Sequence, residues 1–176
     1  MWRGKRSGLL ICALVLVAAG ARGYAAEEIV KAAAPIKGEG RFYKTADDKL
    51  LFSGYFQGIV EVEQGGVLKQ AGLVCPSLLD VNLTAGTQQG EGRCILLTQG
   101  GEYLYARYTC TGKPKEGCAG SFTFTGGTGK FSKVTGESQM ALRSDVLDVV
   151  KTVPERDVTG TFSGQALWGA LKYTTP

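Results

Sequence analysis

Residues 52–62 read FSGYFQGIVEV, and this stretch decides the class of the fold. Its even positions carry Phe, Gly, Phe, Gly, Val and Val, whereas its odd positions include Ser53, Gln57 and Glu61. Side chains of a β-strand alternate between the two faces of a sheet, so this period of two predicts a half-buried strand. The glycines at positions 54 and 58 indicate tight curvature or a close approach of another backbone, as a closed barrel requires.

The same alternation recurs along the chain between glycine-rich turns. In residues 102–110, EYLYARYTC, one face carries Leu104, Ala106, Tyr108 and Cys110. Further segments follow the pattern, and the last, 159–173, places on one face Phe162, Gly164, Ala166, Trp168 and Ala170. Seven or eight such strands, with no long amphipathic helix, predict an all-β fold. We expect a single antiparallel β-barrel of about eight strands, because closure removes exposed edges.

A glycine cluster, GGTGKF, occupies residues 126–131. A phosphate-binding loop requires GxxxxGK followed by Ser or Thr, and then the start of a helix. Here Phe124 stands at the first glycine position and Phe131 at the hydroxyl position, and the following residues read as a strand. We therefore predict a tight turn between strands, in which glycines supply positive φ angles and an aromatic ring returns to the core. The structural residues of this turn are Gly126, Gly127, Gly129 and Phe131.

The segment SFTFTGGTGKFSKVTGES, residues 121–138, resembles the strand–GGTGxF–strand element of the allene oxide cyclase and dirigent-like β-barrel superfamily. The resemblance implies a small eight-stranded antiparallel barrel of calycin-like architecture with a central cavity, in a divergent exported branch. Plant members guide cyclisation or radical coupling inside the barrel. The motif belongs to the architecture, so it implies the fold and assigns no catalytic residue. Related barrels commonly form dimers or trimers, so the resemblance also implies a homo-oligomer.

The first 25 residues have the layout of a secretory signal peptide. A short basic segment precedes the apolar run LLICALVLVAAG, and Gly23 and Ala25 stand at −3 and −1 of an expected cleavage point. The run is shorter than the about 20 residues that a membrane-spanning helix needs. We expect a signal peptide at 1–25, a flexible lead-in at 26–37 and the barrel at 38–176. The protein is then periplasmic or secreted, and it is not an integral membrane protein after cleavage.

Four cysteines follow the expected signal peptide, and an even number in an exported chain indicates disulfides. Three connectivities are open. We favour Cys75 with Cys94 and Cys110 with Cys118, because each pair closes a short loop and TGKPKEG between the second pair is made of turn residues. A four-thiolate zinc site is the alternative, but no CxxC pair supports it.

Net charge and the absence of histidine exclude several function classes. Four of the 20 lysines and arginines lie before residue 25 and no acid does, so the remainder carries 16 bases against 16 acids. Nucleic-acid-binding proteins normally show a basic face, so we expect no nucleic-acid partner. Without histidine, a Ser-His-Asp triad, a Cys-His pair, an HExxH zinc site and a histidine-ligated haem are excluded. We expect neither a metal nor a cofactor.

Two groups of residues are candidates for a binding site. Three tyrosines and an arginine within residues 103–108 could stack a flat ligand or a sugar, although aromatic residues also pack on strand faces. Glu61, with Glu63 two residues on, could supply an acid–base pair or bind a cation, or could lie on a solvated strand edge. The candidate ligand-binding residues are Tyr103, Tyr105, Arg107, Tyr108, Glu61 and Trp168.

Three functions follow from this pattern. We favour non-catalytic binding of a small apolar or amphipathic molecule in the barrel lumen. The first alternative is a cyclase or isomerase that acts by confining a reactive substrate, and its catalytic residues are unknown. The second alternative is a surface interaction or structural module, which a filled lumen together with an exposed apolar patch would favour.

Overall fold

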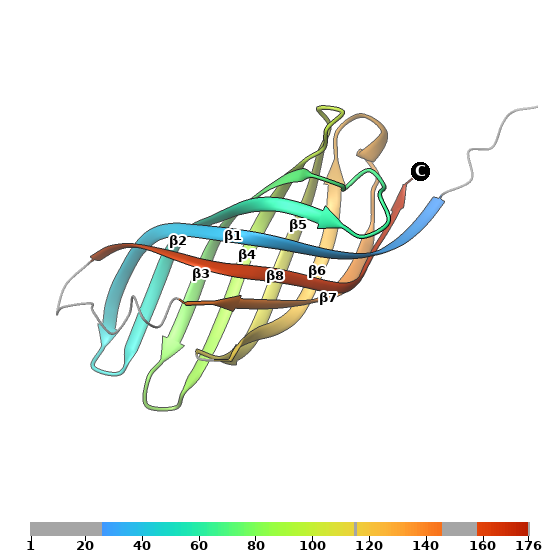
Figure 1. Ribbon diagram of the computed structural model, residues 1–176. Helices are drawn as coiled ribbons and strands as arrows, with labels where there is room; N and C mark the ends of the chain where they lie inside the picture. The colour runs from blue at the N-terminus through green and yellow to red at the C-terminus, as the bar shows by residue number, and fades with distance from the viewer. Residues whose placement is uncertain (1–25, 115, 146–157, 176) are drawn as a thin grey trace, which may run out of the picture.

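The computed structural model describes residues 26–114, 116–145 and 158–175, which fold into a closed antiparallel β-barrel (Figure 1). Each strand pairs with the next in sequence, and β8 pairs with β1 to close the barrel. The predicted all-β fold of about eight strands is confirmed. None of the described residues form a helix long and apolar enough to cross a membrane. The elements are β1 (Ala26–Ala46), β2 (Lys49–Val62), β3 (Ala71–Asn82), β4 (Thr87–Leu97), β5 (Tyr103–Lys113), β6 (Gly117–Gly127), the 3-10 turn η1 (Gly129–Phe131), β7 (Gly136–Ser144) and β8 (Val158–Thr175).

The first strand begins earlier than the sequence indicates. Residues 26–37 are not a flexible lead-in but the first part of β1, where Ala32, Ala34 and Ile36 are buried. Alanine is uncommon in strands, so the local sequence does not favour a strand here. The extended conformation of this segment is stabilised by its pairing with β2 and β8. The expected signal peptide, 1–25, lies outside the described residues.

Buried and exposed residues alternate along β2 and β5 as predicted. On β8 the predicted alternation continues to Trp168 and then fails at Ala170, which is exposed. Gly169 and Ala170 both face outward while Leu171 is buried, because the pairing of β1 with β8 shifts register at this point. Such a β-bulge inserts one residue into a strand and reverses the faces that follow it.

Aromatic side chains fill the interior of the barrel. The ring centroids of Phe42 and Phe52 lie 5.0 Å apart, and those of Phe52 and Phe162 lie 5.3 Å apart. A second group joins Phe122 to Trp168, with ring centroids 5.3 Å apart. The interior of an eight-stranded barrel is just wide enough for side chains to fill, so these rings form a packed core.

Inward-facing glycines make room for the rings. A Cβ atom on Gly38 would lie 2.1 Å from the ring of Phe162, and one on Gly92 would lie 2.4 Å from the ring of Tyr108. The close backbone approach predicted at Gly54 is confirmed, because a Cβ atom there would lie 2.2 Å from a carbonyl oxygen of β1. At these positions a large ring fits because the residue opposite it on the neighbouring strand has no side chain.

Both disulfides of the favoured connectivity are present. Cys75–Cys94 links β3 to β4, and Cys110–Cys118 links β5 to β6. All four cysteines are buried in the core. In a chain-entropy account, closing loops with sequence separations of 19 and 8 stabilises the fold by about 3 and about 2.5 kcal/mol respectively.

The GGTGKF segment forms the predicted turn between β6 and β7. Gly126 and Gly129 have φ angles of 140° and 54°, where glycine is favoured, and Phe131 is fully buried. Gly127 was predicted to supply a positive φ angle, but its role is to allow a close approach of another strand. Its φ is not positive, but a Cβ atom there would lie 2.4 Å from the carbonyl oxygen of Tyr103.

Replacing Gly38 with alanine tests the packing of the core. We expect Gly38→Ala to lower the free energy of unfolding by about 1–3 kcal/mol, because the buried ring of Phe162 has little room to move in a close-packed interior. Chemical denaturation followed by the fluorescence of Trp168 measures this loss. A second change, Phe162→Leu, should relieve part of the strain, so the two substitutions together should cost less than the sum of each alone.

The matched control is Gly169→Ala, because a Cβ atom at position 169 meets no atom within 4 Å. We expect it to change the free energy of unfolding by less than about 0.5 kcal/mol. A Gly38→Ala variant as stable as the control would contradict the packing described here.

Candidate functional site

The six residues predicted to bind a ligand lie on opposite sides of the barrel wall. Tyr108 and Trp168 are buried in the interior. The other four are exposed on the outer surface: Tyr103, Tyr105, Arg107 and Glu61. Even-numbered residues of β5 face inward and odd-numbered ones outward, so the predicted aromatic patch is divided by the wall.

Tyr108 is a residue of the core. Its ring centroid lies 5.7 Å from that of Phe56. Burial raises the pKa of the Tyr108 hydroxyl to about 12, a hydrogen bond with Ser77 acts in the opposite direction, and the charge of Glu91 adds to the rise. A phenol that stays neutral at ordinary pH supplies packing and a hydrogen bond.

The interior that was expected to hold a ligand is occupied by the protein's own side chains. Trp168 packs edge-on against Phe122, and Phe124 packs edge-on against Tyr173. The Tyr173 hydroxyl donates a hydrogen bond to the Glu28 carboxylate, and burial with this hydrogen bond raises the pKa of Tyr173. These side chains and the two disulfides pack in the interior of the barrel, so the outer surface is the second region in which a ligand or partner can bind.

Large apolar side chains are concentrated on one part of that surface. Strands that face solvent on one side normally carry polar residues there. In the described residues, eight of the ten exposed large hydrophobic side chains lie on β2–β5, namely Tyr55, Ile59, Val74, Leu78, Ile95, Leu97, Tyr103 and Tyr105. Four of them form adjacent cross-strand pairs between β4 and β5. We call these four the ridge: Ile95 opposite Tyr105, and Leu97 opposite Tyr103.

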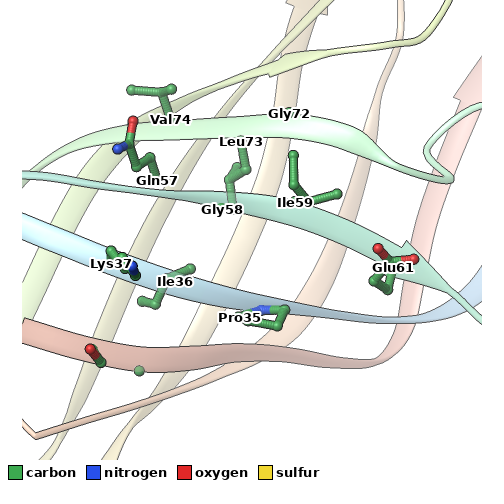
Figure 2. Close-up of a pocket in the computed structure, with 12 residues that line it drawn as sticks. Pro35, Ile36, Lys37, Gln57, Gly58, Ile59, Glu61, Gly72, Leu73 and Val74 are labelled. Atoms are coloured by element: carbon green, nitrogen blue, oxygen red, sulfur yellow. The ribbon is translucent and has the colours of Figure 1, made fainter.

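A groove of about 790 Å³ adjoins the ridge and crosses β8, β1, β2 and β3 (Figure 2). Pro35, Ile59 and Val74 supply apolar lining, and Gly72, on the outer face of β3, adds no side chain to it. Figure 2 shows Lys37 and Glu61 toward opposite ends of the groove. The volume is in the range of about 300–1,000 Å³ that small-molecule sites occupy.

Two arginines flank the ridge. Arg93 and Arg107 lie directly opposite each other on β4 and β5, and both are exposed. Within the ranges that the structure describes, neither forms a salt bridge. Glu91, two residues before Arg93 on the same face, is opposite Thr109. Like charges directly opposite each other destabilise a strand pair, so this pair of arginines favours an external counter-charge.

Acidic side chains lie in and beside the groove. Glu61 lines it, and Glu63 approaches Lys31 at 4.0 Å. Glu39 on β1 accepts a hydrogen bond from the Tyr55 hydroxyl at 3.1 Å, and this contact raises the pKa of Tyr55. Among the described residues, no group of three or more acidic or cysteine side chains could hold a metal ion.

Comparisons of the chain with models of protein families, with curated proteins and with solved structures found no match. The fold and the surface nevertheless define a class of molecule: a small disulfide-linked β-barrel whose interior is occupied and whose outer surface carries an apolar ridge beside a groove.

Sequence reasoning missed the apolar residues that dominate this surface. These residues occupy outward positions on β2, β3 and β4, in which buried and exposed positions alternate: Ile59, Val74, Ile95 and Leu97. The signal was present in the sequence, because each is an apolar residue where the strand pattern calls for a polar one. Their proximity could not be read from the sequence, since it depends on the registers of β2–β5.

Tyr108 makes stability decrease at alkaline pH. Its pKa is about 12 in the folded protein and about 10 in an unfolded chain, so between these values the folded protein retains a proton that the unfolded chain has released. Its contribution is fully present below pH 10 and is lost as the pH rises through 12, with a slope of at most about 1.4 kcal/mol per pH unit.

We expect Tyr108→Phe to remove this contribution, so that its free energy of unfolding falls less steeply above pH 10 than that of the wild-type protein. Urea unfolding at a series of pH values measures both slopes. Tyr105→Phe is the control, because Tyr105 is exposed on the same strand. Equal slopes for Tyr108→Phe and the wild type would contradict the assignment.

Proposed function

We propose that this protein is an exported interaction module, which binds a partner through the outer surface formed by the ridge and the groove. The single observation that carries the proposal is the concentration of exposed apolar side chains on β2–β5. Contiguous exposed apolar surface marks sites of interaction, because water favours its burial. Arg93 and Arg107, which form no salt bridge with any described residue, support a partner that also supplies acidic groups.

The occupied lumen argues for this function over luminal binding and over a confining cyclase or isomerase. Both of the latter require space for a substrate inside the barrel, where aromatic rings now pack against one another. A small amphipathic molecule remains a second candidate ligand, favoured by the volume and apolar lining of the groove. It would bind outside the barrel rather than inside it.

The two disulfides support an oxidising compartment and therefore export to the periplasm or the cell exterior. The GGTGKF turn and the eight-stranded barrel support a place for this chain in the allene oxide cyclase and dirigent-like superfamily. The apolar surface supports the homo-oligomer that this resemblance implies.

Site-specific photo-crosslinking in the cells that export the protein tests the proposed function. A photoreactive phenylalanine derivative is placed at Ile95 or Tyr105 on the ridge, and at Gln139 as an exposed control on β7. We expect an adduct of discrete mass from both ridge positions and none from the control position. The mass of the adduct identifies the partner as a protein or as a small molecule.

An absence of adducts at both ridge positions would overturn the proposed function. Adducts of the same masses from the ridge and from Gln139 would also overturn it, because they would report collisions rather than a specific surface.

A further inference from the structure

We propose that the partner of this surface is an anionic membrane, with the ridge against the acyl chains of the lipids and the neighbouring arginines on lipid phosphates. This inference rests on the proposed function and names its partner. The contact is peripheral and reversible, because the barrel lies on one leaflet and touches many lipids. Its strength is set by the apolar area that leaves water and by the attraction between basic side chains and anionic headgroups.

The apolar part of the surface is continuous across four strands. It consists of two adjacent rows of outward residues. The first row, read from β2 to β5, contains Ile59, Gly72, Leu97 and Tyr103. The second row, read from β3 to β5, contains Val74, Ile95 and Tyr105. We call these seven residues the apolar face. Its six large side chains are between 39% and 48% exposed, and none of them carries a charge or an amide group.

This composition fits the hydrocarbon region of a leaflet. A polar group that enters hydrocarbon loses its hydrogen bonds to water, so a face that dips into lipid has to lack such groups over its whole width. Strands lie about 4.8 Å apart, so four strands make the apolar face roughly 14 Å wide. Tyr103 and Tyr105 add rings with a polar tip, and such rings favour the boundary between hydrocarbon and headgroups.

The next row on β4 and β5 is cationic. Arg93 precedes Ile95 by two residues, Arg107 follows Tyr105 by two, and the two arginines are directly opposite each other. Neither forms a salt bridge with a described residue. Two adjacent guanidinium groups suit a phosphate, because each donates two parallel hydrogen bonds and the anion removes the repulsion between them.

The order of the side chains follows the order of the layers in a leaflet. The apolar face is bordered on β4 and β5 by the two arginines, just as the acyl chains are bordered by the phosphates. An acidic protein could also contact the arginines. A bilayer supplies hydrocarbon and phosphate side by side, so the observations favour a membrane over a protein.

The nearby acids leave this attraction in place. Glu91 lies two residues before Arg93, on the side away from the apolar face, so it stays in water. Glu102 is already paired with Lys130 at 3.2 Å. Glu61 lies at the β2 edge of the apolar face and opposes binding, but the two arginines outnumber it.

Binding to vesicles of defined composition tests the inference. The protein purified from its export compartment is mixed with vesicles of phosphatidylethanolamine and phosphatidylglycerol, or with vesicles of phosphatidylcholine alone. Flotation then separates the bound protein. We expect binding at least about tenfold tighter to the anionic vesicles, since basic side chains are attracted to an anionic surface. Added salt should weaken the binding, because ions screen this attraction.

Two pairs of matched variants locate the contact. Arg107→Glu should weaken binding to the anionic vesicles at least about tenfold, whereas Arg143→Glu makes the same charge change at an exposed position of β7 and should have little effect. Ile95→Glu should also weaken binding, and Gln139→Glu is its control on β7. Near-ultraviolet circular dichroism of each variant shows that the barrel is folded. Equal losses within either pair would overturn the inference.

Fluorescence quenching tests which side chains enter the lipid. Tryptophan is placed on the ridge by Ile95→Trp and on β7 by Gln139→Trp, and the anionic vesicles carry lipids brominated on their acyl chains. Trp168 is buried in the core and gives the same background in both variants. We expect quenching several times stronger at position 95 than at position 139. Equal quenching at the two positions would overturn the inference.

The outcomes separate this inference from the proposed function. A protein that does not bind the anionic vesicles, or that binds neutral vesicles equally well, would overturn the membrane contact. The proposed function would survive that result if the ridge crosslinks to a protein in cells. Crosslinked adducts with the masses of phospholipids would support both.

Discussion

The packing of aromatic rings against inward glycines is the constraint on which the rest of the structure depends. Gly38 faces the ring of Phe162, and Gly92 faces the ring of Tyr108, at distances that admit no Cβ atom. The interior of eight strands is just wide enough for side chains to fill, and at these two positions a large ring stands opposite a residue that has no side chain. The packing of rings opposite glycines gives the barrel a dense core. The two disulfides join neighbouring strands within this core.

Because packed side chains occupy the lumen, we expect the functional site on the outer surface. A strand has only two faces, and in the described strands the inner face packs mostly into the hydrophobic core. The outer face of β2–β5 departs from the polar composition that a solvent-facing surface normally has. The groove extends from β8 and β1 onto β2 and β3, where Val74 pairs with Ile95 of the ridge, so the groove, the ridge and the opposed arginines form one continuous surface.

Much of the fold could be predicted from the sequence, because its main signals are local. The alternation in residues 52–62 and 102–110, the turn at 126–131 and the short disulfide loops depend on residues close together in the chain. Residues 26–37 and Ala170 were misplaced because distant pairing and a β-bulge decide their conformation. The candidate site was predicted less well. Tyr108 was grouped with its neighbours in sequence, whereas surfaces of a barrel are assembled across strands by register.

The most direct test of the central claim is native mass spectrometry of the protein purified from its export compartment, followed by denaturation without reductant. A filled barrel that acts through its outer surface predicts a native mass that is a whole multiple of the chain mass, with each chain four hydrogens lighter for its two disulfides. A stoichiometric small molecule that is retained in the native state and released only on denaturation would contradict this account. Retention of the same molecule by a Gln57→Arg variant, whose long side chain would occupy the groove, would place it inside the barrel rather than in the groove.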